Sequence, residues 1–214
     1  MTTQKNILYL GLNPPKSTPE RNIVHYPVIK IIPRPPSDPN IHKSFQDINK
    51  YTHIIFTSQS SIKIFFEYLS VFKLTTSDIS NKIFVCVGTM TAEALRKHGI
   101  AADIIAQNET AEGIIEELSK LNLINSYFLW PRSALARDVL TNYFKRSSIK
   151  AFECPLYDTT PFQPGPLPDL THFHEIIFTS PSTVDAFKNL FPYLPKHLVL
   201  TPIGPITKKQ LLKI

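Results

Sequence analysis

Short runs of apolar residues alternate along the chain with segments in which apolar residues recur at helical spacing. Residues 54–57 read Ile-Ile-Phe-Thr, a run of the length of a buried strand. After a serine-rich turn, four apolar residues follow at positions i, i+3, i+4 and i+7: Ile62, Phe65, Phe66 and Leu69. This spacing places them on one face of a helix. The pattern therefore predicts a strand, a polar turn and an amphipathic helix.

The same pattern begins again at Ile176. Over twelve positions aligned from Ile54 and Ile176, seven residues are identical. Each copy continues with a second strand-like run, a Gly-x-x-Thr turn and another helical segment, with the turns at 88–91 and 204–207. A match of this length and order predicts two related strand–helix–strand–helix units.

Two extended segments, 25–32 and 151–159, flank the central block, and each adjoins a cluster of prolines. Extended, proline-flanked segments are typical of stiff connections between domains. We predict an α/β fold of two lobes with mostly parallel sheets, joined by a two-stranded antiparallel linker, the first lobe being discontinuous. The predicted bounds are 1–33 and 158–214 for lobe one, 37–150 for lobe two, and 25–36 and 151–159 for the linker strands.

Within lobe two, the pattern predicts three further elements after the first copy. A helix opens at Thr110 and runs through Leu118, a strand covers 127–129, and a helix runs from about Ser133 to Arg146. In lobe one, residues 12–25 carry three prolines and no helical period, so no helix is expected there.

Composition narrows the choice of function. A net charge of +6 favours an anionic partner, although the basic residues are scattered as on an ordinary solvated surface. No nucleic-acid-binding motif is present, and no segment approaches the roughly 20 apolar residues that span a bilayer. Cys86 and Cys154 lie in no metal-ligand pattern, and two isolated thiols indicate a reducing compartment. We expect a cytoplasmic protein that binds a small anion, without nucleic acid, membrane or metal.

Hydroxyl-bearing residues and glycines follow the predicted strands at the point where helices begin. The carboxyl ends of parallel strands form the usual ligand crevice, and helix N-termini there suit carboxylate or phosphate. The same residue types also cap helices and form turns, and a duplicated domain duplicates its caps, so both roles stay open. The candidate binding residues are Thr57, Ser58, Ser60, Gly88 and Thr91 in lobe two and Ser180, Ser182, Gly204 and Thr207 in lobe one.

Eight segments in order resemble the uroporphyrinogen-III synthase family, over about Tyr26 to the C-terminus. The resemblance implies two α/β lobes and a hydro-lyase of porphyrin and haem biosynthesis. Such an enzyme cyclises hydroxymethylbilane, a linear tetrapyrrole polycarboxylate, inverts ring D and releases water, with no metal or organic cofactor. The segments are YPVIKI, THIIFTSQSS, VCVGTMTAEALRKHGI, TAEGIIEEL, LWPRSALARDVL, PLYDTTP, EIIFTSPSTVDAF and PIGPITKKQL.

The resemblance also implies roles for single residues. Tyr157 matches a tyrosine whose hydroxyl assists departure of the ring A hydroxyl, although a linker tyrosine also suits a purely structural role. Thr207 matches the family's most sensitive threonine, and Ser58 and Ser180 match carboxylate-contacting positions. Arg132 is a further candidate, because its guanidinium presents five donors in a rigid fork that suits carboxylates.

The chain departs from the family pattern in lobe one. Family members carry a helix where residues 12–25 stand here, and they continue beyond the second Gly-x-x-Thr turn, so we expect an abbreviated lobe one. This leaves two alternatives: a non-catalytic synthase-like module that binds a tetrapyrrole or another small polycarboxylate, and a two-lobed protein for phosphate or a simple carboxylate. We expect a monomer whose partner is its small-molecule substrate. A transient contact with the preceding pathway enzyme fits the same interpretation.

Overall fold

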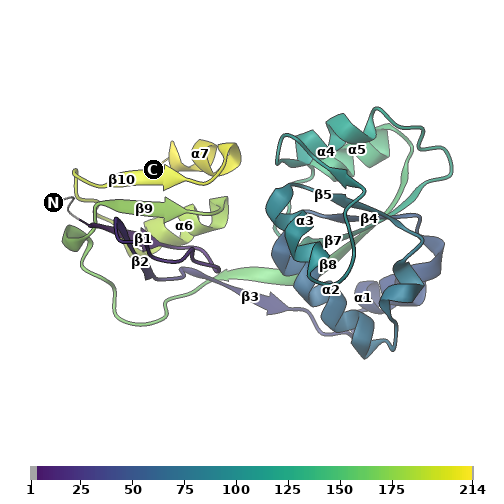
Figure 1. Ribbon diagram of the computed structural model, residues 1–214, viewed down its shortest axis with the longest axis horizontal. Coiled ribbons are helices and arrows are strands. Elements are labelled where there is room, and N and C mark those ends of the chain that lie inside the picture. Colours follow the sequence, from purple (N-terminus) through teal and green to yellow (C-terminus); the bar gives the residue numbers. More distant parts are fainter. Residues whose placement is uncertain (1–3, 214) are drawn as a thin grey trace. The chain divides into compact units, whose positions relative to one another are not determined.

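The computed structural model describes residues 4–213. The chain divides into two compact units: unit 1 comprises Met1–Ile31 with Thr159–Ile214, and unit 2 comprises Ile32–Asp158. Both ends of the chain therefore belong to unit 1 (Figure 1). Each unit contains a mostly parallel sheet with helices, which confirms the predicted fold class.

The sheet of unit 2 has six strands in the order β3-β8-β7-β4-β5-β6. The five strands from β8 to β6 are all parallel to one another. The chain steps from β4 outwards to β5 and β6 and then returns to the other side of β4, so the strand order reverses between β4 and β7. The strands are β3 (Ile29–Pro33), β4 (His53–Phe56), β5 (Ile83–Cys86), β6 (Ile104–Ile105), β7 (Tyr127–Ser133) and β8 (Lys150–Pro161).

Strands β3 and β8 form the predicted two-stranded antiparallel linker. The Arg34 amide donates to the Leu156 carbonyl at 2.8 Å, and the Phe162 amide donates to the Val28 carbonyl at 2.8 Å. From one bond to the other the residue number falls on β3 while it rises on β8, so the pair is antiparallel. Each strand crosses the boundary between the two units.

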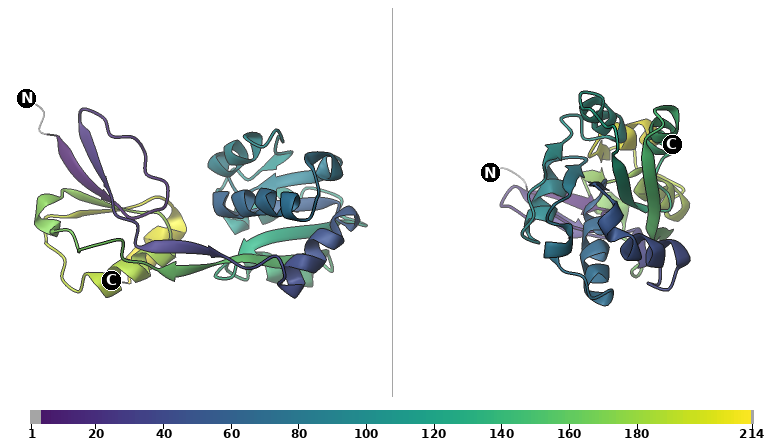
Figure 2. Two further views of the ribbon diagram at one scale, coloured as in Figure 1. Left: turned by 90° about the horizontal axis from the view of Figure 1, so that it is seen from below. Right: turned by 90° about the vertical axis from the view of Figure 1, so that its right-hand side faces the viewer.

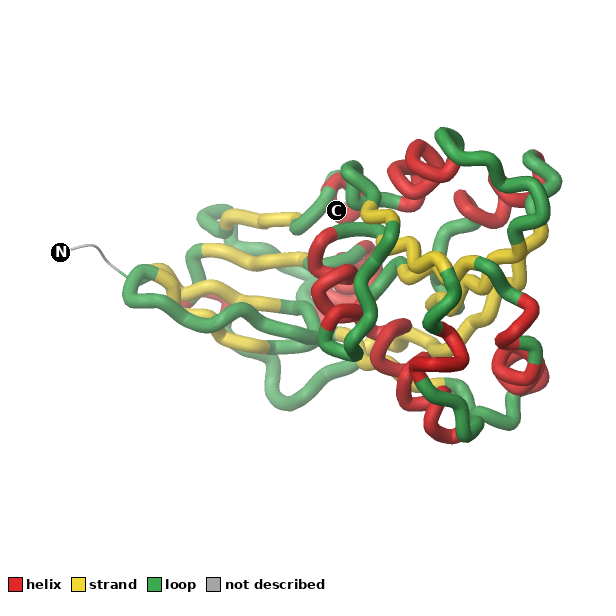
Figure 3. The backbone as a smooth tube through the Cα atoms, turned by 45° about the vertical axis from the view of Figure 1, so that its right-hand side comes forward, coloured by secondary structure: helices red, strands yellow, loops and turns green. Residues whose placement is uncertain are grey.

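Helices cover both faces of the unit 2 sheet (Figures 1 and 3). On one face Ile114 of α4 and Phe144 of α5 join Ile55 and Trp130 in a buried core. On the other face Phe65 of α2 packs edge-on against Phe56, with ring centres 5.3 Å apart. The helices are α1 (Pro39–Gln46), α2 (Gln59–Val71), α3 (Thr89–Arg96), α4 (Ala111–Leu118) and α5 (Val139–Arg146), with short 3₁₀ turns η1 (Ile48–Lys50) and η2 (Thr76–Ile79).

The sheet of unit 1 has four parallel strands in the order β10-β9-β1-β2. Its core includes Phe187 of α6, which packs edge-on against Phe178 with ring centres 5.2 Å apart. The strand order reverses between β1 and β9. The elements are β1 (Lys5–Tyr9), β2 (Arg21–His25), η3 (Leu170–His172), β9 (Glu175–Phe178), α6 (Pro181–Leu190), β10 (Val199–Pro202) and α7 (Pro205–Leu211).

An extended loop, residues 10–20, connects β1 to β2 without a helix, as its prolines predicted; it is the dark purple loop in the left view of Figure 2. Extended chain covers about 3.3 Å per residue, so this loop is long enough to return along a five-residue strand. The Lys5 amide donates to the Glu20 carbonyl and the Ile23 amide to Ser17 Oγ, which hold the loop against the strands. Strand β2 itself was not predicted, because Arg-Asn-Ile-Val-His has only two strongly apolar positions.

The predicted helix from Ser133 to Arg146 is wrong in its first turn and a half. Strand β7 runs on to Ser133, and α5 begins only at Val139. The strand was predicted to end before Pro131, because proline has no backbone N–H to donate to a neighbouring strand. Beyond Leu129, however, β7 pairs with β8 alone, so proline stands at a free edge. The residues that follow β4 and β7 therefore lie at one carboxyl edge of the sheet.

Gly113 in α4 offers a test of how tightly unit 2 is packed. A Cβ there would lie 1.8 Å from the Asn108 carbonyl oxygen, a backbone atom that cannot swing aside. Gly113→Ala should therefore lower the free energy of unfolding by about 1–3 kcal/mol in urea titrations. Gly165→Ala, whose Cβ would meet nothing within 4 Å, is the control and should change stability by less than about 0.5 kcal/mol. Equal stability of the two variants would contradict the packing.

Candidate functional site

Ser58, Ser133 and Tyr157 form a cluster of hydroxyl groups at the carboxyl edge of the unit 2 sheet. Ser58 follows β4 and caps α2, where its Oγ accepts from the Ser61 amide at 3.1 Å. The same Oγ lies 2.9 Å from the Tyr157 hydroxyl on β8. Ser133 is the register partner of Tyr157 on β7. The cluster therefore lies beside the reversal of strand order between β4 and β7, where α/β sheets bind ligands.

The Tyr157 phenol is kept neutral by its surroundings. Its side chain is almost wholly buried, and this burial raises the pKa above the usual value of 10.0. Hydrogen bonds with the hydroxyls of Ser58 and Ser133 lower the pKa by a smaller amount. At neutral pH the phenol thus holds a proton, and the half-buried Ser58 is the more accessible end of the pair. Ser133 was missed because its segment was predicted as helix.

Thr57 and Ser60 flank Ser58 at the same strand end. Thr57 Oγ1 accepts a hydrogen bond from Trp130 Nε1 at 3.3 Å, which ties the end of β4 to β7. Ser60 lies half-buried in the first turn of α2. The structure therefore brings three of the candidate binding residues together with Tyr157.

Arg132, a further candidate, lies near the end of β7. Its side chain is only 9% exposed and forms an ion pair with Glu153 on the neighbouring strand. Further donors reach the carbonyls of Ser133 and Ala136, and the guanidinium lies 4.5 Å from the centre of the Trp130 ring. These partners join β7 to β8, and contact of Arg132 with a ligand stays a prediction.

The Gly-x-x-Thr turn of unit 2 opens α3. Gly88 is the N-cap residue, and Thr91 in the first turn is buried, with no hydrogen bond from its hydroxyl to any residue in 4–213. The Thr89 amide donates to Glu109 Oε1 at 2.8 Å, so a carboxylate of the chain itself lies at this helix N-terminus. Glu109 was not among the candidates, because it precedes a different helix.

Unit 1 repeats the arrangement with its own residues. Ser180 caps α6 and accepts from the Thr183 amide at 3.3 Å, while its Oγ lies 2.8 Å from that of Ser182. Gly204 caps α7, and a Cβ there would meet nothing within 4 Å. Thr207 is buried in the first turn of α7. These four candidates thus belong to unit 1 and the other candidates to unit 2.

Gly11 is a further residue of this edge in unit 1. It follows β1, and a Cβ there would lie 2.4 Å from Thr179 Cγ2, at the end of the neighbouring β9. The close approach requires glycine where the strand order reverses. A glycine directly after an apolar run was the available sequence signal, the same one that marked Gly88 and Gly204.

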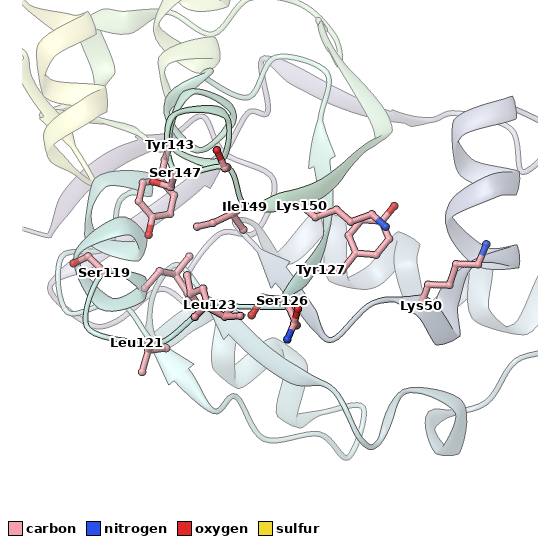
Figure 4. Close-up of a pocket in the computed structure, with 14 residues that line it drawn as sticks. Lys50, Ser119, Leu121, Leu123, Ser126, Tyr127, Tyr143, Ser147, Ile149 and Lys150 are labelled. Carbon is pink, nitrogen blue, oxygen red and sulfur yellow. The ribbon is translucent and has the colours of Figure 1, made fainter.

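A hollow of about 1040 Å³ lies at the opposite, amino edge of the unit 2 sheet (Figure 4). It contains none of the candidate residues. Its lining includes Lys50 and Lys150 but no member of the cluster around Tyr157. The cluster around Tyr157 is the better candidate for a ligand site, because it lies at the carboxyl ends of the strands, where α/β sheets bind ligands. The lining residues are Lys50, Leu118, Ser119, Leu121, Leu123, Ile124, Asn125, Ser126, Tyr127, Tyr143, Ser147, Ser148, Ile149 and Lys150.

Among the described residues, the thiols and potential metal ligands form no second site. Cys86 and Cys154 are free and buried, and burial raises the pKa of their thiols to about 12 and about 11. Neither forms a nucleophilic thiolate at neutral pH. Within residues 4–213 no three His, Cys, Asp or Glu side chains gather as metal ligands. Over the same residues, no helix has the length and apolar character needed to cross a membrane.

A conservative change at Arg132 tests its structural role. Arg132→Lys keeps the charge but loses the fork that reaches Glu153 and the carbonyls, so the free energy of unfolding should fall by about 1–3 kcal/mol. Arg137→Lys is the control: Arg137 pairs with Glu112 at the surface, where side chains are 41% and 48% exposed, and the loss should stay below about 1 kcal/mol. Denaturant melts of both variants decide, and an unchanged Arg132→Lys protein would free this residue for ligand contact.

Comparison with known proteins finds a family model and a relative that match most of this chain. The family model described as uroporphyrinogen-III synthase HemD matches residues 20–214. The porphyrin biosynthesis protein HemD of Ruminiclostridium josui is 31% identical over 173 residues, which cover 77% of this chain and 33% of that protein. The match thus spans about a third of the length of that relative.

Solved structures agree in fold. A uroporphyrinogen III synthase of Thermus thermophilus superposes with a TM-score of 0.66 at 12% identity, over 98% of this chain and 88% of the other. The uroporphyrinogen-III synthetase of Helicobacter pylori gives a TM-score of 0.63 at 17% identity, over 98% and 89%. Because the family model covers both units, the chain belongs to the uroporphyrinogen-III synthase HemD family.

Proposed function

We propose that this protein is an active uroporphyrinogen-III synthase, a hydro-lyase that cyclises hydroxymethylbilane with inversion of ring D and loss of water. The observation that carries the proposal is the family match over residues 20–214, which includes residues from both units. The hydroxyl cluster at the carboxyl edge of unit 2 supports it with suitable chemistry. Units 1 and 2 would serve as the two lobes of the enzyme.

The substrate class follows from the donors at the two carboxyl edges. Hydroxyl groups and helix N-termini bind carboxylates through charge-assisted hydrogen bonds worth roughly 1.5–3 kcal/mol each. A tetrapyrrole with acetate and propionate arms offers several carboxylates to several such donors. We assign the arms to Thr57, Ser60, Gly88 and Thr91 in unit 2 and to Ser180, Ser182, Gly204 and Thr207 in unit 1, and we assign Ser58 to the reacting hydroxyl group.

Tyr157 and Ser58 would supply the proton for the first step. The carbon–oxygen bond of the ring A hydroxymethyl group breaks as its oxygen takes a proton and leaves as water. We assign this proton to the Ser58 hydroxyl, which is refilled from the neutral Tyr157 phenol 2.9 Å away. The cation left on ring A is attacked by the substituted carbon of ring D, which gives a spiro intermediate. The bond from that carbon to the bridge carbon of ring C then breaks, and the bridge carbon bonds to the free carbon of ring D, which loses its proton. The proton released when the macrocycle is completed returns to Tyr157.

Positioning would do more than proton transfer in this reaction, because the substrate cyclises on its own. A bound geometry that favours attack by the substituted carbon of ring D selects isomer III over isomer I. Orientation of reacting groups can supply roughly 7–11 kcal/mol in favourable cases. The capped, hydroxyl-lined strand ends are rigid enough to hold carboxylate arms for this purpose.

We also propose a cytoplasmic, monomeric enzyme that receives its substrate from the preceding pathway enzyme. Two free, buried thiols suit a reducing compartment. A substrate that cyclises spontaneously favours a short transfer between the two enzymes.

Freshly generated hydroxymethylbilane tests the function directly. Purified protein is added, the products are oxidised, and the porphyrin isomers are separated. Enrichment of isomer III establishes the synthase. Isomer I alone, together with saturable binding of uroporphyrin III, would indicate a non-catalytic module, for which the helix-free connection between β1 and β2 would then be the first structural explanation.

Substitutions at Tyr157 and Thr207 separate proton transfer from positioning. Tyr157→Phe keeps the buried ring but deletes the acidic proton, so kcat should fall roughly 10- to 100-fold. Thr207→Ala removes a hydroxyl beside the α7 N-terminus and should cost roughly 1–3 kcal/mol of binding or orientation, about 5- to 150-fold in kcat/KM.

Two matched variants complete this set. Ser58→Ala should lower kcat as much as Tyr157→Phe does, because both belong to one proton path. Thr207→Ser keeps the hydroxyl and should retain most of the activity. Steady-state assays on proteins with unchanged thermal melts decide; full activity of Tyr157→Phe would leave this tyrosine with a packing role only.

A further inference from the structure

The N-terminus of α3 already holds a carboxylate that belongs to the chain. Thr89, the first residue of the helix, donates its amide hydrogen to Glu109 Oε1 at 2.8 Å. Gly88, the N-cap residue, has no side chain with which to cap the helix itself. Glu109 therefore satisfies a helix end at which the proposed function places a substrate carboxylate.

The space above Gly88 is fitted to this carboxylate. A Cβ on Gly88 would lie 2.5 Å from Glu109 Cδ and 2.6 Å from Oε1. In unit 1 the equivalent glycine, Gly204, has nothing within 4 Å of the same point. The two related turns therefore differ in one respect: the first is filled by a carboxylate of the chain, and the second is open.

Thr91 provides a second, independent sign of a ligand. It is 5% exposed, yet its hydroxyl makes no hydrogen bond within residues 4–213. The fully buried polar atoms without a partner in that range are Tyr51 OH and Thr160 Oγ1, so the Thr91 hydroxyl keeps some contact with solvent. A hydroxyl held in the first turn of α3 without a partner suits a ligand atom there.

The backbone on both sides of Glu109 is held by hydrogen bonds, while its side chain is exposed. Thr110 caps α4 by accepting from the Gly113 amide at 3.1 Å, and Asn108 Nδ2 donates to Glu116 Oε2 at 2.7 Å. Glu109 between them is exposed, and its carboxylate has no cationic partner among the described ion pairs. Rotation about its side-chain bonds alone would release the helix end.

We propose that Glu109 is an internal competitor for the carboxylate subsite at the α3 N-terminus. This rests on the proposed function, since it assumes that a carboxylate of the substrate binds there. A tethered group has an effective concentration in the millimolar range, so a lone carboxylate displaces it poorly. A ligand already anchored through other arms presents its own tethered carboxylate and exchanges with Glu109 at little cost. Glu109 would therefore select polycarboxylates over simple acids.

The test follows the Thr89 amide by NMR while propionate, a single-arm probe, is titrated. In the unaltered protein the amide signal should respond only at high propionate concentration. In Glu109→Ala the midpoint should fall about 10-fold, because the competitor is gone. Glu109→Gln, which keeps the shape but loses the charge, should lie between the two and covers the case in which Glu109→Ala folds poorly.

Two controls decide between this role and a general effect of charge or an ordinary helix cap. Glu93→Gln removes one negative charge from the exposed face of α3 and should leave the midpoint unchanged. Adding Gly88→Ala to Glu109→Ala puts a methyl group where the carboxylate was and should abolish the response.

Equal midpoints in the unaltered protein and in Glu109→Ala would overturn the proposal, as would a Thr89 amide that never responds. The titration needs no turnover, so its result is independent of the isomer assay. A shifted midpoint in a protein that makes only isomer I would keep the competitor and reject the synthase.

Discussion

Unsatisfied backbone N–H groups at helix N-termini are the constraint on which this structure depends. In a parallel sheet with short connections, helices begin at the carboxyl ends of the strands, so their unpaired donors collect at one edge. The chain meets this requirement with Ser58, Thr110 and Ser180 as side-chain caps, and with the Glu109 carboxylate at α3. The same donors make that edge the natural place for a polyanion.

The duplicated pattern made much of the fold predictable. Strand, capped turn and helix recur as local sequence signals, and the structure contains both copies with Ser58 and Ser180 as equivalent caps. Strand β2 was not predicted, because an edge strand needs few apolar residues. The end of β7 was not predicted, because Pro131 is tolerated only where the neighbouring strand has already ended. Both errors concern strand pairing, which a local pattern does not encode.

The surroundings of single side chains were predictable to a smaller extent. Tyr157 and Ser58 come from segments far apart in sequence, and their 2.9 Å contact depends on the order β8-β7-β4. Arg132 has the side chain expected of a carboxylate receptor, but the strand places it beside Glu153, which faces the same way on β8. Whether an arginine meets a ligand or a neighbouring glutamate is decided by register, and register is a property of the folded sheet.

A binding site built from hydroxyl and backbone donors carries less fixed charge than one built from arginines. A buried guanidinium fixes a permanent charge and needs a permanent partner, as the pair of Arg132 and Glu153 shows. Helix N-termini carry only partial charge, so they tolerate water, an internal carboxylate or a ligand in turn. A site built from them can release a large polyanionic product whose individual contacts are moderate. The proposed reaction also needs a neutral proton donor, and a buried tyrosine beside serines meets that condition where a histidine or lysine would add charge.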